Sequence, residues 1–374
     1  MVDLRSQYLK IQNEINTAIQ EVIDQTAFIN GPQVGKFATE LESYLGAKHV
    51  IPCANGTDAL QIAMMALGLK PGDEVITPSF TYIATVEVVG LLNLRPVFCE
   101  VDSKTFCIDA NEIEKLITPK TKAIVPVHLY GQCADMEAIL KIAQKHNLFV
   151  IEDNAQAIGG YYTFSDGTKK ATGTMGDIGS TSFFPSKNLG CYGDGGALYT
   201  NNDALAEKIK MVANHGQKVK YIHEVIGCNS RLDTMQAAIL RVKLPHLDTY
   251  CDARRKVADT YDAAFANHAS IETPYRSANA YHVFHQYTLK LKGINRDEVQ
   301  EKLKAKGIPS MVYYPIPAHK QKMFEAFGLS NTDLTLTEKL TEQVISLPIH
   351  TEMKEEEQQF IINQFLEIIN SYTA

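Results

Sequence analysis

Short apolar segments alternate with longer helical stretches through the N-terminal part of the chain. The apolar segments lie at residues 75–76, 96–98, 123–127, 148–151 and 180–184. Stretches such as residues 135–146 lie between them and are predicted helices. Short apolar strands separated by helices are typical of a mainly parallel sheet that is covered on both faces. The pattern therefore predicts an α/β fold.

A different arrangement is predicted for the C-terminal part of the chain. A helix from about residue 248 to 266 precedes a strand at 285–290 and a second helix at 297–306. We therefore expect two domains. Residues 1–245 would form a large α/β domain with an N-terminal helical segment, and residues 246–374 a smaller α+β domain.

Composition and charge narrow the class of protein. The chain of 374 residues is 45% hydrophobic and 21% charged, an ordinary globular composition, and its formal net charge is -7. Lysine and arginine residues are scattered, so we expect no nucleic-acid partner. The first residues are polar and no apolar run approaches the roughly 18 residues of a membrane span. We therefore expect a soluble protein without a membrane partner.

The cysteines indicate a reducing compartment. All seven are scattered, at positions 53, 99, 107, 133, 191, 228 and 251. They form no Cys-x-x-Cys pair and no metal-binding pattern, so we predict no metal site. Reduced thiols in the cytoplasm are the simplest explanation.

One lysine with an unusual setting is the first candidate for chemistry. Lys187 lies in the run Ser-Phe-Phe-Pro-Ser-Lys-Asn-Leu-Gly, between an apolar strand and a glycine-rich turn. Burial lowers the pKa of such an amine and makes it nucleophilic, and a Schiff base with a carbonyl cofactor is its commonest use. The alternative is a solvated loop lysine, which a single motif does not exclude.

A carboxylate at the end of a buried strand strengthens this hypothesis. Asp153 follows the apolar segment 148–151 and is followed by Gln156. A buried carboxylate needs a cationic or strongly donating partner. Pyridoxal 5'-phosphate (PLP) explains both residues, because its aldehyde reacts with a lysine and its ring nitrogen stays protonated opposite an aspartate. The alternative role for Asp153 is to cap the next helix.

A phosphate-binding turn is predicted around Gly56. The sequence Cys-Ala-Asn-Gly-Thr-Asp-Ala-Leu has the pattern of a strand, a tight turn and a helix capped by Asn55 or Thr57. Amides at a helix start attract a dianion, glycine permits close approach, and the hydroxyls of Thr57 and Ser182 add donors. The negative charge of Asp58 would repel a phosphate unless its side chain points away from it. A plain capped helix is the alternative.

An aromatic wall is predicted beside this turn. Tyr82 follows the strand at residues 75–76, at the end where ligands bind in parallel sheets, so its ring is placed to stack on the pyridine ring of PLP. Packing in the core is the commoner role of an aromatic side chain, and we expect it for Phe80.

These segments, in this order, resemble the DegT/DnrJ/EryC1/StrS family of PLP-dependent nucleotide-sugar aminotransferases. The resemblance spans nearly the whole chain. It also covers residues 28–34, 126–131, 193–196 and 227–232. It implies the PLP-dependent transferase fold of the aspartate aminotransferase type I, with a large mainly parallel-sheet domain and a smaller C-terminal α+β domain.

The resemblance also implies roles for the matching residues. Lys187 is the expected Schiff-base lysine and proton carrier, and Asp153 the partner of the pyridinium nitrogen. Gln156 is expected near the ring hydroxyl of PLP, and Tyr82 is the stacking aromatic residue. The residues at the phosphate-binding positions are Gly56, Thr57 and Ser182.

Two further residues suggest a site shared between subunits. Asn229 matches a residue that family members donate to the phosphate bound by the neighbouring subunit, and Arg231 lies close to it in sequence. The resemblance therefore implies a homodimer with shared active sites. The alternative is a surface turn that opens a helix at residues 234–240.

The sequences of several segments resemble a smaller group of enzymes within the family, and this similarity indicates a substrate. The segments most similar to bacterial enzymes that aminate UDP-2-acetamido-2-deoxy-3-oxo-D-glucuronate are residues 53–62, 129–135, 181–196 and 231–234. This implies L-glutamate as amino donor and a 3-amino nucleotide sugar for lipopolysaccharide or another surface polysaccharide as product. Candidate substrate contacts are Arg231, Tyr313, Tyr314 and His319. Tyr313 stands where relatives often carry histidine, and a surface loop at the dimer rim is the alternative for this segment.

Other functions remain as alternatives. Sugar dehydratases on this fold replace the lysine, which is present here, and a dinucleotide oxidoreductase needs a Gly-x-Gly-x-x-Gly turn after its first strand, which is absent. An aminotransferase for another UDP- or dTDP-keto sugar, aminated at C3 or C4, is a closer alternative. A non-catalytic binding or regulatory protein is another, although the presence of Lys187, Asp153 and Gln156 argues against it.

Overall fold

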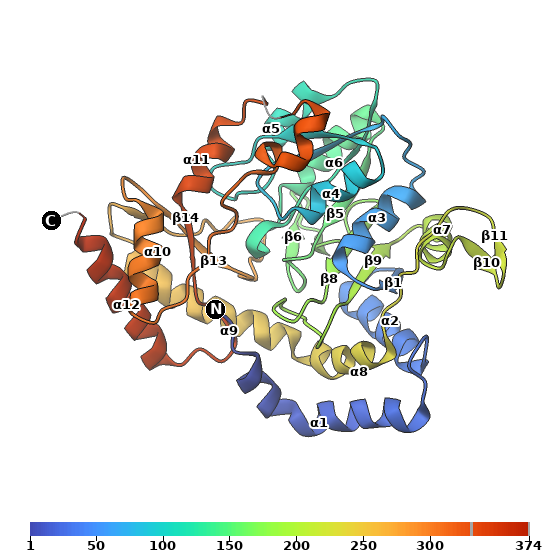
Figure 1. Cartoon of the computed structure of the whole chain (residues 1–374), viewed down its shortest axis with the longest axis horizontal. Coiled ribbons are helices and arrows are strands. Elements are labelled where there is room, and N and C mark those ends of the chain that lie inside the picture. Colours follow the sequence, from blue (N-terminus) through green and yellow to red (C-terminus); the bar gives the residue numbers. More distant parts are fainter. Residues whose placement is uncertain (330–331, 373–374) are drawn as a thin grey trace.

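A seven-stranded sheet forms the centre of the molecule (Figure 1). The computed structural model describes residues 1–329 and 332–372. The strands lie in the order β1 (His49–Cys53), β9 (Gly196–Thr200), β8 (Ile178–Ser182), β5 (Phe149–Asp153), β4 (Thr121–Ile124), β2 (Glu74–Pro78) and β3 (Arg95–Cys99). From β8 to β3 all neighbours are parallel, whereas β9 is antiparallel to β8 and β1. The predicted mainly parallel sheet is confirmed.

Helices cover both faces of this sheet. Successive side chains of a strand point to opposite faces, so Val75 and Ile76 of β2 join different hydrophobic clusters. Val75 packs with helices on one face, and Ile76 with a helix on the other. These helices are α3 (Gly56–Ala66), α4 (Ala84–Leu91) and α7 (Asp203–Ala213) on the Val75 face, and α6 (Met136–His146) on the Ile76 face.

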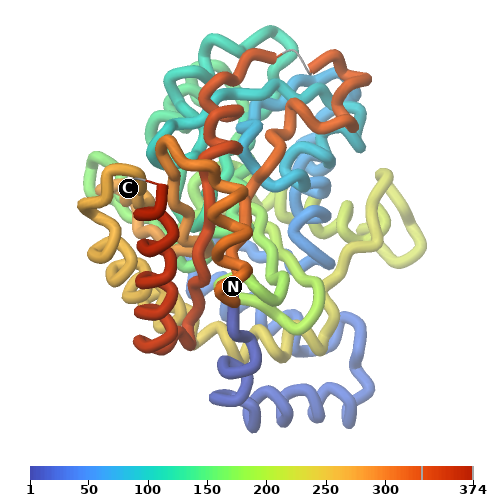
Figure 2. The backbone as a smooth tube through the Cα atoms, turned by 60° about the vertical axis from the view of Figure 1, so that its left-hand side comes forward, coloured from blue at the N-terminus to red at the C-terminus, as the bar shows by residue number. Residues whose placement is uncertain are grey.

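The first helix extends along one end of the molecule, where it is blue in Figures 1 and 2. Ile11 and Ile15 of α1 (Leu4–Gln25) pack against Ile239 of α8 (Thr234–Lys243). Helix α2 (Pro32–Leu45) contacts α8 as well. The predicted N-terminal helical segment is therefore joined to the rest of the fold largely through α8.

A second, antiparallel sheet follows later in the chain. It has the order β12 (Ile271–Glu272), β13 (Tyr287–Leu291) and β14 (Val344–Leu347), and it shares a core with α9 (Leu247–Phe265), α10 (Arg296–Ala305) and α12 (Glu355–Asn370). The predicted helices at 248–266 and 297–306 and the strand at 285–290 correspond to α9, α10 and β13. The proposed division at residue 245 falls in the 3-10 turn η3 (Leu244–His246), and it stays a prediction.

Residues 311–329 and 332–343 return to the first sheet. The amide of Ala318 donates to the carbonyl oxygen of Ser79, directly after β2 (2.9 Å). Glu100, directly after β3, accepts hydrogen bonds from the amides of Leu336 and Thr337 in α11 (Thr335–Gln343), both at 3.0 Å. This segment therefore lies along the edge where the parallel strands end, called the carboxyl edge below.

The remaining elements are short. They are the hairpins β6 (Tyr161–Thr163) with β7 (Lys169–Ala171) and β10 (Gln217–Val219) with β11 (Ile222–His223), and the helical turns α5 (Ala110–Ile113), η1 (Glu114–Leu116), η2 (Leu129–Gly131), η4 (Ala318–Lys320) and η5 (Lys322–Phe327). Among the described residues, no helix has the length and apolar character that a membrane crossing needs. All seven cysteines are free, and the described chain contains no cluster of His, Cys, Asp or Glu that could hold a metal ion.

Two strands end earlier than the sequence pattern predicts. The strand expected to reach residue 127 is β4, which ends at Ile124, and the strand expected to reach residue 184 is β8, which ends at Ser182. Ser182 pairs with Gly196, the first residue of β9. One further backbone bond follows, from the amide of Phe183 to the carbonyl oxygen of Gly195 (2.7 Å), and the chain then turns toward Lys187.

A buried carboxylate fixes the loops around the carboxyl edge. Glu152 of β5 is fully buried. Its two oxygens accept hydrogen bonds from Nε2 of His128 (2.9 Å) and from the amides of Gly173, Met175 and Gly176 (2.8, 2.6 and 2.6 Å). Charge-assisted hydrogen bonds of this kind are the strong ones, and they join three segments at one point.

Replacement of Glu152 by alanine should therefore lower the stability of the fold. We expect a loss of about 3 kcal/mol or more, because four buried donors would lose their acceptor. Urea unfolding of the Glu152→Ala variant measures this loss. The matched control is Glu114→Ala, which removes an exposed carboxylate paired with Lys145 and His146 and should leave the midpoint nearly unchanged. Equal unfolding midpoints for the two variants would contradict the role of Glu152 in stabilising the fold.

Candidate active site

One cavity brings most of the predicted residues together. It has a volume of about 790 Å³ and lies at the carboxyl edge, where α3 begins and where β5 and β8 end. The predicted residues that line it are Gly56, Thr57, Tyr82, Asp153, Gln156, Ser182, Lys187, Tyr313 and Tyr314. Residues from the first sheet, from the loops that follow its strands and from the returning segment therefore meet at this cavity.

Lys187 lies in a turn that leaves little room for change. A Cβ atom at Gly190 would come within 2.4 Å of the carbonyl oxygen of Pro185, so the turn is closed tightly. The ammonium group of the buried Lys243 holds the carbonyl oxygen of Gly190 at 2.6 Å. Asn188, next to Lys187, donates its side-chain amide to the carbonyl oxygen of Val283 (3.1 Å). These contacts fix the turn from two sides.

The amine of Lys187 is easier to deprotonate than an ordinary lysine amine. Burial lowers its pKa to about 8, and the negative charge of Asp153 opposes this shift. None of the hydrogen bonds or ion pairs among the described residues involves the Lys187 amine. At neutral pH a useful fraction of this amine is therefore free to act as a nucleophile or base.

Asp153 is held by donors on both carboxylate oxygens. One oxygen accepts the hydroxyl of Thr85 in α4 (2.8 Å), and Thr85 in turn contacts the hydroxyl of Thr81 (2.9 Å). The other accepts the amide of Ala155 (3.1 Å). No helix begins after Asp153, so the alternative that it is a helix cap is wrong. Both oxygens therefore act as acceptors, and each has a second lone pair for a further donor such as a protonated ring nitrogen.

The start of α3 provides room for an anion. Asn55 caps the helix by accepting the amide of Asp58 (2.8 Å). The first amides of a helix have no partner within the helix, and they attract negative charge. A Cβ atom at Gly56 would lie 2.8 Å from Cβ of Ser182, so only glycine permits this contact between α3 and β8. Asp58 also lines the cavity and adds an unfavourable charge to it.

A network of polar and aromatic side chains forms the opposite wall. The side-chain oxygen of Gln156 accepts the amide of Tyr130 (2.7 Å), and its nitrogen donates to the hydroxyl of Tyr314 (2.9 Å). These two bonds fix the orientation of the amide. The ring of Tyr82 is 58% exposed and lies 6.1 Å from that of Tyr314, whereas Phe80 is fully buried, as predicted.

The structure places Asn229 and Arg231 in a neighbouring hollow. This hollow has a volume of about 440 Å³ and shares Asn55 and Asp194 with the cavity. Neither Asn229 nor Arg231 lines the cavity of its own chain. The Nε atom of Arg231 is buried and has no hydrogen-bond partner among the described residues.

His319 occupies a position that differs from the prediction. Its ring is fully buried and does not line the cavity, so the predicted substrate contact by His319 has no support in the structure. One ring nitrogen bonds the hydroxyl of Ser79 (2.7 Å), and the other contacts Glu338 of α11 (3.0 Å). His319 therefore ties the segment that carries Tyr313 and Tyr314 to the first sheet.

Sequence patterns missed several residues of the cavity wall. Thr81, Asp194, His285 and Gln286 line it as well, and Thr85 reaches Asp153 from the first turn of α4. His285 and Gln286 begin a predicted strand, and Asp194 lies in a segment that carries the family resemblance, but neither signal gave these residues a place in the site. Their place in the wall depends on contacts between distant parts of the chain.

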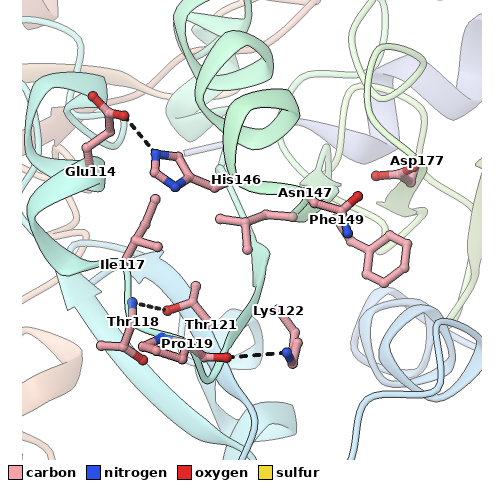
Figure 3. A pocket seen from close by; sticks show the side chains of 11 residues that line it. Glu114, Ile117, Thr118, Pro119, Thr121, Lys122, His146, Asn147, Phe149 and Asp177 are labelled. Atoms are coloured by element: carbon pink, nitrogen blue, oxygen red, sulfur yellow. Dashed lines mark hydrogen bonds and ion pairs between the residues drawn. The ribbon is translucent and has the colours of Figure 1, made fainter.

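A second cavity lies at the opposite edge of the first sheet (Figure 3). Its volume is about 690 Å³. Its polar groups contact one another, as Glu114 and His146 do at 2.8 Å and Lys122 and the carbonyl oxygen of Pro119 do at 3.4 Å. It contains none of the predicted site residues. The cavity at the carboxyl edge is therefore the candidate active site.

The lowered pKa of Lys187 gives a direct test of this site. In the cofactor-free protein, the rate at which Lys187 forms an imine with a small aldehyde should rise with pH through a midpoint of about 8. The reason is that burial destabilises the ammonium form, so the reactive free amine is present at lower pH. Trapping by borohydride and peptide mass spectrometry measure this rate. A midpoint near that of an exposed lysine would contradict the assignment.

The chain is similar to one known protein family and to several named proteins. The model of the DegT/DnrJ/EryC1/StrS aminotransferase family matches residues 9–366. A Geobacillus stearothermophilus protein named pleiotropic regulatory protein is 47% identical over 100% of this chain and 99% of its own. The UDP-2-acetamido-2-deoxy-3-oxo-D-glucuronate aminotransferase of Pseudomonas aeruginosa is 47% identical over 93% of this chain and 94% of its own. The UDP-N-acetyl-3-dehydro-alpha-D-glucosamine 3-aminotransferase of Acidithiobacillus ferrooxidans is 46% identical over 96% and 94%.

Solved structures show the same fold. DesV of S. venezuelae, in complex with a ketimine intermediate, has a TM-score of 0.93 and 38% identity over 98% of this chain and 97% of its own. The Bacillus subtilis protein NtdA, with the bound cofactor PMP, has a TM-score of 0.89 and 35% identity over 96% of this chain and 82% of its own. The similarity covers both sheets of the present structure.

Proposed function

This chain belongs to the DegT/DnrJ/EryC1/StrS aminotransferase family, and we propose that it is the PLP-dependent enzyme that aminates UDP-2-acetamido-2-deoxy-3-oxo-D-glucuronate. L-Glutamate would donate the amino group, and the product would be the 3-amino nucleotide sugar used for lipopolysaccharide or another bacterial surface polysaccharide. The relative that carries this activity in its name is 47% identical over nearly the whole chain. The free cysteines fit a place in the cytoplasm.

The observation that carries the proposal is the pairing of Lys187 and Asp153 in one cavity. A buried amine with a pKa of about 8 lies near a carboxylate whose two oxygens already accept hydrogen bonds. An amine of this kind reacts with an aldehyde, and a carboxylate of this kind holds a protonated ring nitrogen. Both groups line the same cavity of about 790 Å³, which is large enough for PLP and part of a sugar.

Residues of this chain would hold PLP at several points. The start of α3 at Gly56 and Thr57, together with the hydroxyl of Ser182, would bind the phosphate. Gln156 lies beside Asp153 in the cavity wall and would lie near the ring hydroxyl. Tyr82, whose ring is exposed toward the cavity, would cover one face of the pyridine ring. The close contact between Gly56 and Ser182 fits a cradle that is shaped for a phosphate.

The chemistry divides between the cofactor and Lys187. When bound, PLP supplies a ring that accepts the negative charge left by removal of a proton from carbon. Asp153 keeps the ring nitrogen protonated, and the free amine of Lys187 takes the proton from the α carbon of L-glutamate. In the second half of the reaction, Lys187 returns a proton to the carbon of the sugar that receives nitrogen. A pKa of about 8 lets this amine both accept and release a proton near neutral pH.

The charges of the cavity support a homodimer with shared sites. The charged side chains that line it are Asp58, Asp153, Asp194 and Lys187. The phosphate of PLP, the diphosphate of UDP and the uronate carboxylate would meet too few cations in such a site. The adjoining hollow holds Arg231, whose Nε atom lacks a partner among the described residues, together with Asn229. These two residues would therefore serve the cavity of a second copy.

The identity of the sugar rests on the relatives and on the returning segment. Tyr313 and Tyr314 line the cavity and would contact the sugar. Of the two sugar aminotransferases compared, one acts on a glucuronate and the other on a glucosamine, as their names state. Amination at C3 is common to both names, whereas the carboxylate is not. A regulatory role, which the name of another relative suggests, is less well supported because Lys187, Asp153 and Gln156 are all in place.

Replacement of Lys187 tests the catalytic assignment. The Lys187→Ala variant should lose turnover by about 10³-fold or more, because no other amine in the cavity wall can move the proton. It should still bind PLP, since the phosphate cradle and Asp153 remain. Release of 2-oxoglutarate and equilibrium binding of PLP measure the two properties. The control is Lys169→Ala, an exposed lysine of β7, and comparable turnover in both variants would contradict the assignment.

Mixed dimers test the shared site. Lys187→Ala and Arg231→Ala homodimers should each be nearly inactive, because each lacks one part of every site. When equal amounts of the two variants are unfolded and refolded together, half of the dimers are mixed, and each mixed dimer has both residues intact in one of its two sites. Activity should therefore return to about a quarter of the wild-type value. The control mixes each variant with itself. If the mixture stays as inactive as the single variants, the two residues do not meet across a dimer.

A further inference from the structure

His285 is a cavity residue that the proposed chemistry does not use. It lies two residues before β13, in the second sheet, and its side chain is 7% exposed. Its ring borders the same cavity as Lys187, and the positive charge of Lys187 acts on it. A histidine this close to the proposed catalytic amine is a candidate for a further role in the reaction.

The loop that carries His285 is fixed on several sides. Phe284 has a left-handed backbone conformation (φ 47°), and its amide donates to Nδ1 of His282 at 3.0 Å. The rings of His282 and Phe284 are stacked with their centroids 3.8 Å apart. Val283 accepts the side chain of Asn188 through its carbonyl oxygen at 3.1 Å, which joins this loop to the turn of Lys187. The backbone that carries His285 is therefore fixed, and the residue itself is buried.

A buried arginine lies behind this loop. Arg254 of α9 is 4% exposed and takes part in none of the ion pairs of the described chain. Its Nη1 atom donates to the carbonyl oxygens of Phe284, His285 and Ile349, at 3.3, 3.2 and 3.2 Å. Burial, Lys187 and Arg254, in that order, lower the pKa of His285 well below its ordinary value. The imidazole is therefore neutral at physiological pH.

The surroundings also select one tautomer of this neutral ring. The Nδ1 atom of His285 is enclosed and has no hydrogen-bond partner among the described residues. A buried N–H without an acceptor is rarer and less favourable than an acceptor without a donor. The proton of the ring therefore belongs on Nε2.

We propose that enclosure of the Nδ1 atom fixes His285 as the neutral Nε2–H tautomer, and that this N–H is a hydrogen-bond donor to an oxygen atom of the sugar substrate beside Lys187. Because Nδ1 is enclosed, the ring edge that borders the cavity is the one that carries Nε2. A fixed neutral donor orients a hydroxyl or carbonyl oxygen without adding a charge that would compete with the proton on Lys187. The ligand part of this inference rests on the proposed function, whereas the tautomer does not.

The tautomer can be measured without substrate or turnover. Two-bond ¹H–¹⁵N correlation spectra of protein labelled at histidine distinguish Nδ1–H, Nε2–H and imidazolium forms. The signal that disappears in the His285→Gln variant identifies His285, in both the cofactor-free and the PLP-loaded protein. We expect an Nε2–H pattern that does not change between about pH 5.5 and 8.5, a range in which an ordinary histidine titrates. An Nδ1–H pattern, or titration within this range, would overturn the proposal.

A matched pair of substitutions tests the donor. The side-chain nitrogen of glutamine reaches the position of Nε2, whereas that of asparagine reaches only the position of Nδ1. We therefore expect His285→Gln to keep most of kcat/KM for the keto sugar, and His285→Asn to lose about tenfold to a hundredfold, the effect of one lost hydrogen bond. The half-reaction with L-glutamate should change little in either variant. Equal kcat/KM for the two variants would overturn the donor role.

Two controls keep these outcomes separate. Thermal unfolding of both variants identifies a loss of activity that comes from a loss of structure, and the comparison is made between variants of equal stability. If the wild-type protein itself fails to aminate the sugar while His285 shows the Nε2–H pattern, the proposed substrate fails and the tautomer assignment stands. If the sugar is aminated and the pattern is Nδ1–H, the inference about His285 fails and the proposed function stands.

Discussion

Burial of the Lys187 amine is the interaction on which the rest of the site depends. Removal from water lowers its pKa to about 8, while the charge of Asp153 prevents a larger shift. These two opposing effects on the pKa depend on where both groups lie, so Lys187 and Asp153 must stay at fixed positions. The fold provides this by placing Asp153 at the end of β5 and Lys187 in a tight turn after β8, on neighbouring parallel strands.

Contacts from distant parts of the chain maintain this arrangement. Lys243 of α8 and Val283 of the loop before β13 hold the turn of Lys187 through Gly190 and Asn188. Each contact joins elements that are far apart in sequence. The buried charges of Lys243 and Arg254 are used in the same way, since both bind backbone carbonyl oxygens of loops around the cavity. The positive charge of Arg254 also favours the neutral form of His285 in the cavity wall.

Most of the fold could be predicted from the sequence because its strands are short apolar runs and its helices are long. The strand that ends at Asp153 and the helix α9 follow from local patterns, as does the start of α3, for which the sequence offered Asn55 or Thr57 as the cap and the structure has Asn55. The position of His319 could not be predicted, because its burial against Ser79 depends on a segment that returns across the sheet. The same holds for Thr85 and His285, whose roles arise only when distant segments meet. The roles of the site residues toward PLP and the sugar remain predictions.

The absorption spectrum of the PLP-loaded protein gives the most direct test of the proposed amino transfer between L-glutamate and the nucleotide sugar. The amino-sugar product, UDP-2-acetamido-3-amino-2,3-dideoxy-D-glucuronate, is added to one sample and L-glutamate to a parallel one. Both should remove the visible absorption band, because each is an amino donor in one direction of the reaction. If L-glutamate alone removes the band, the proposed sugar is contradicted. If neither does, the assignment of this cavity as an aminotransferase site is contradicted.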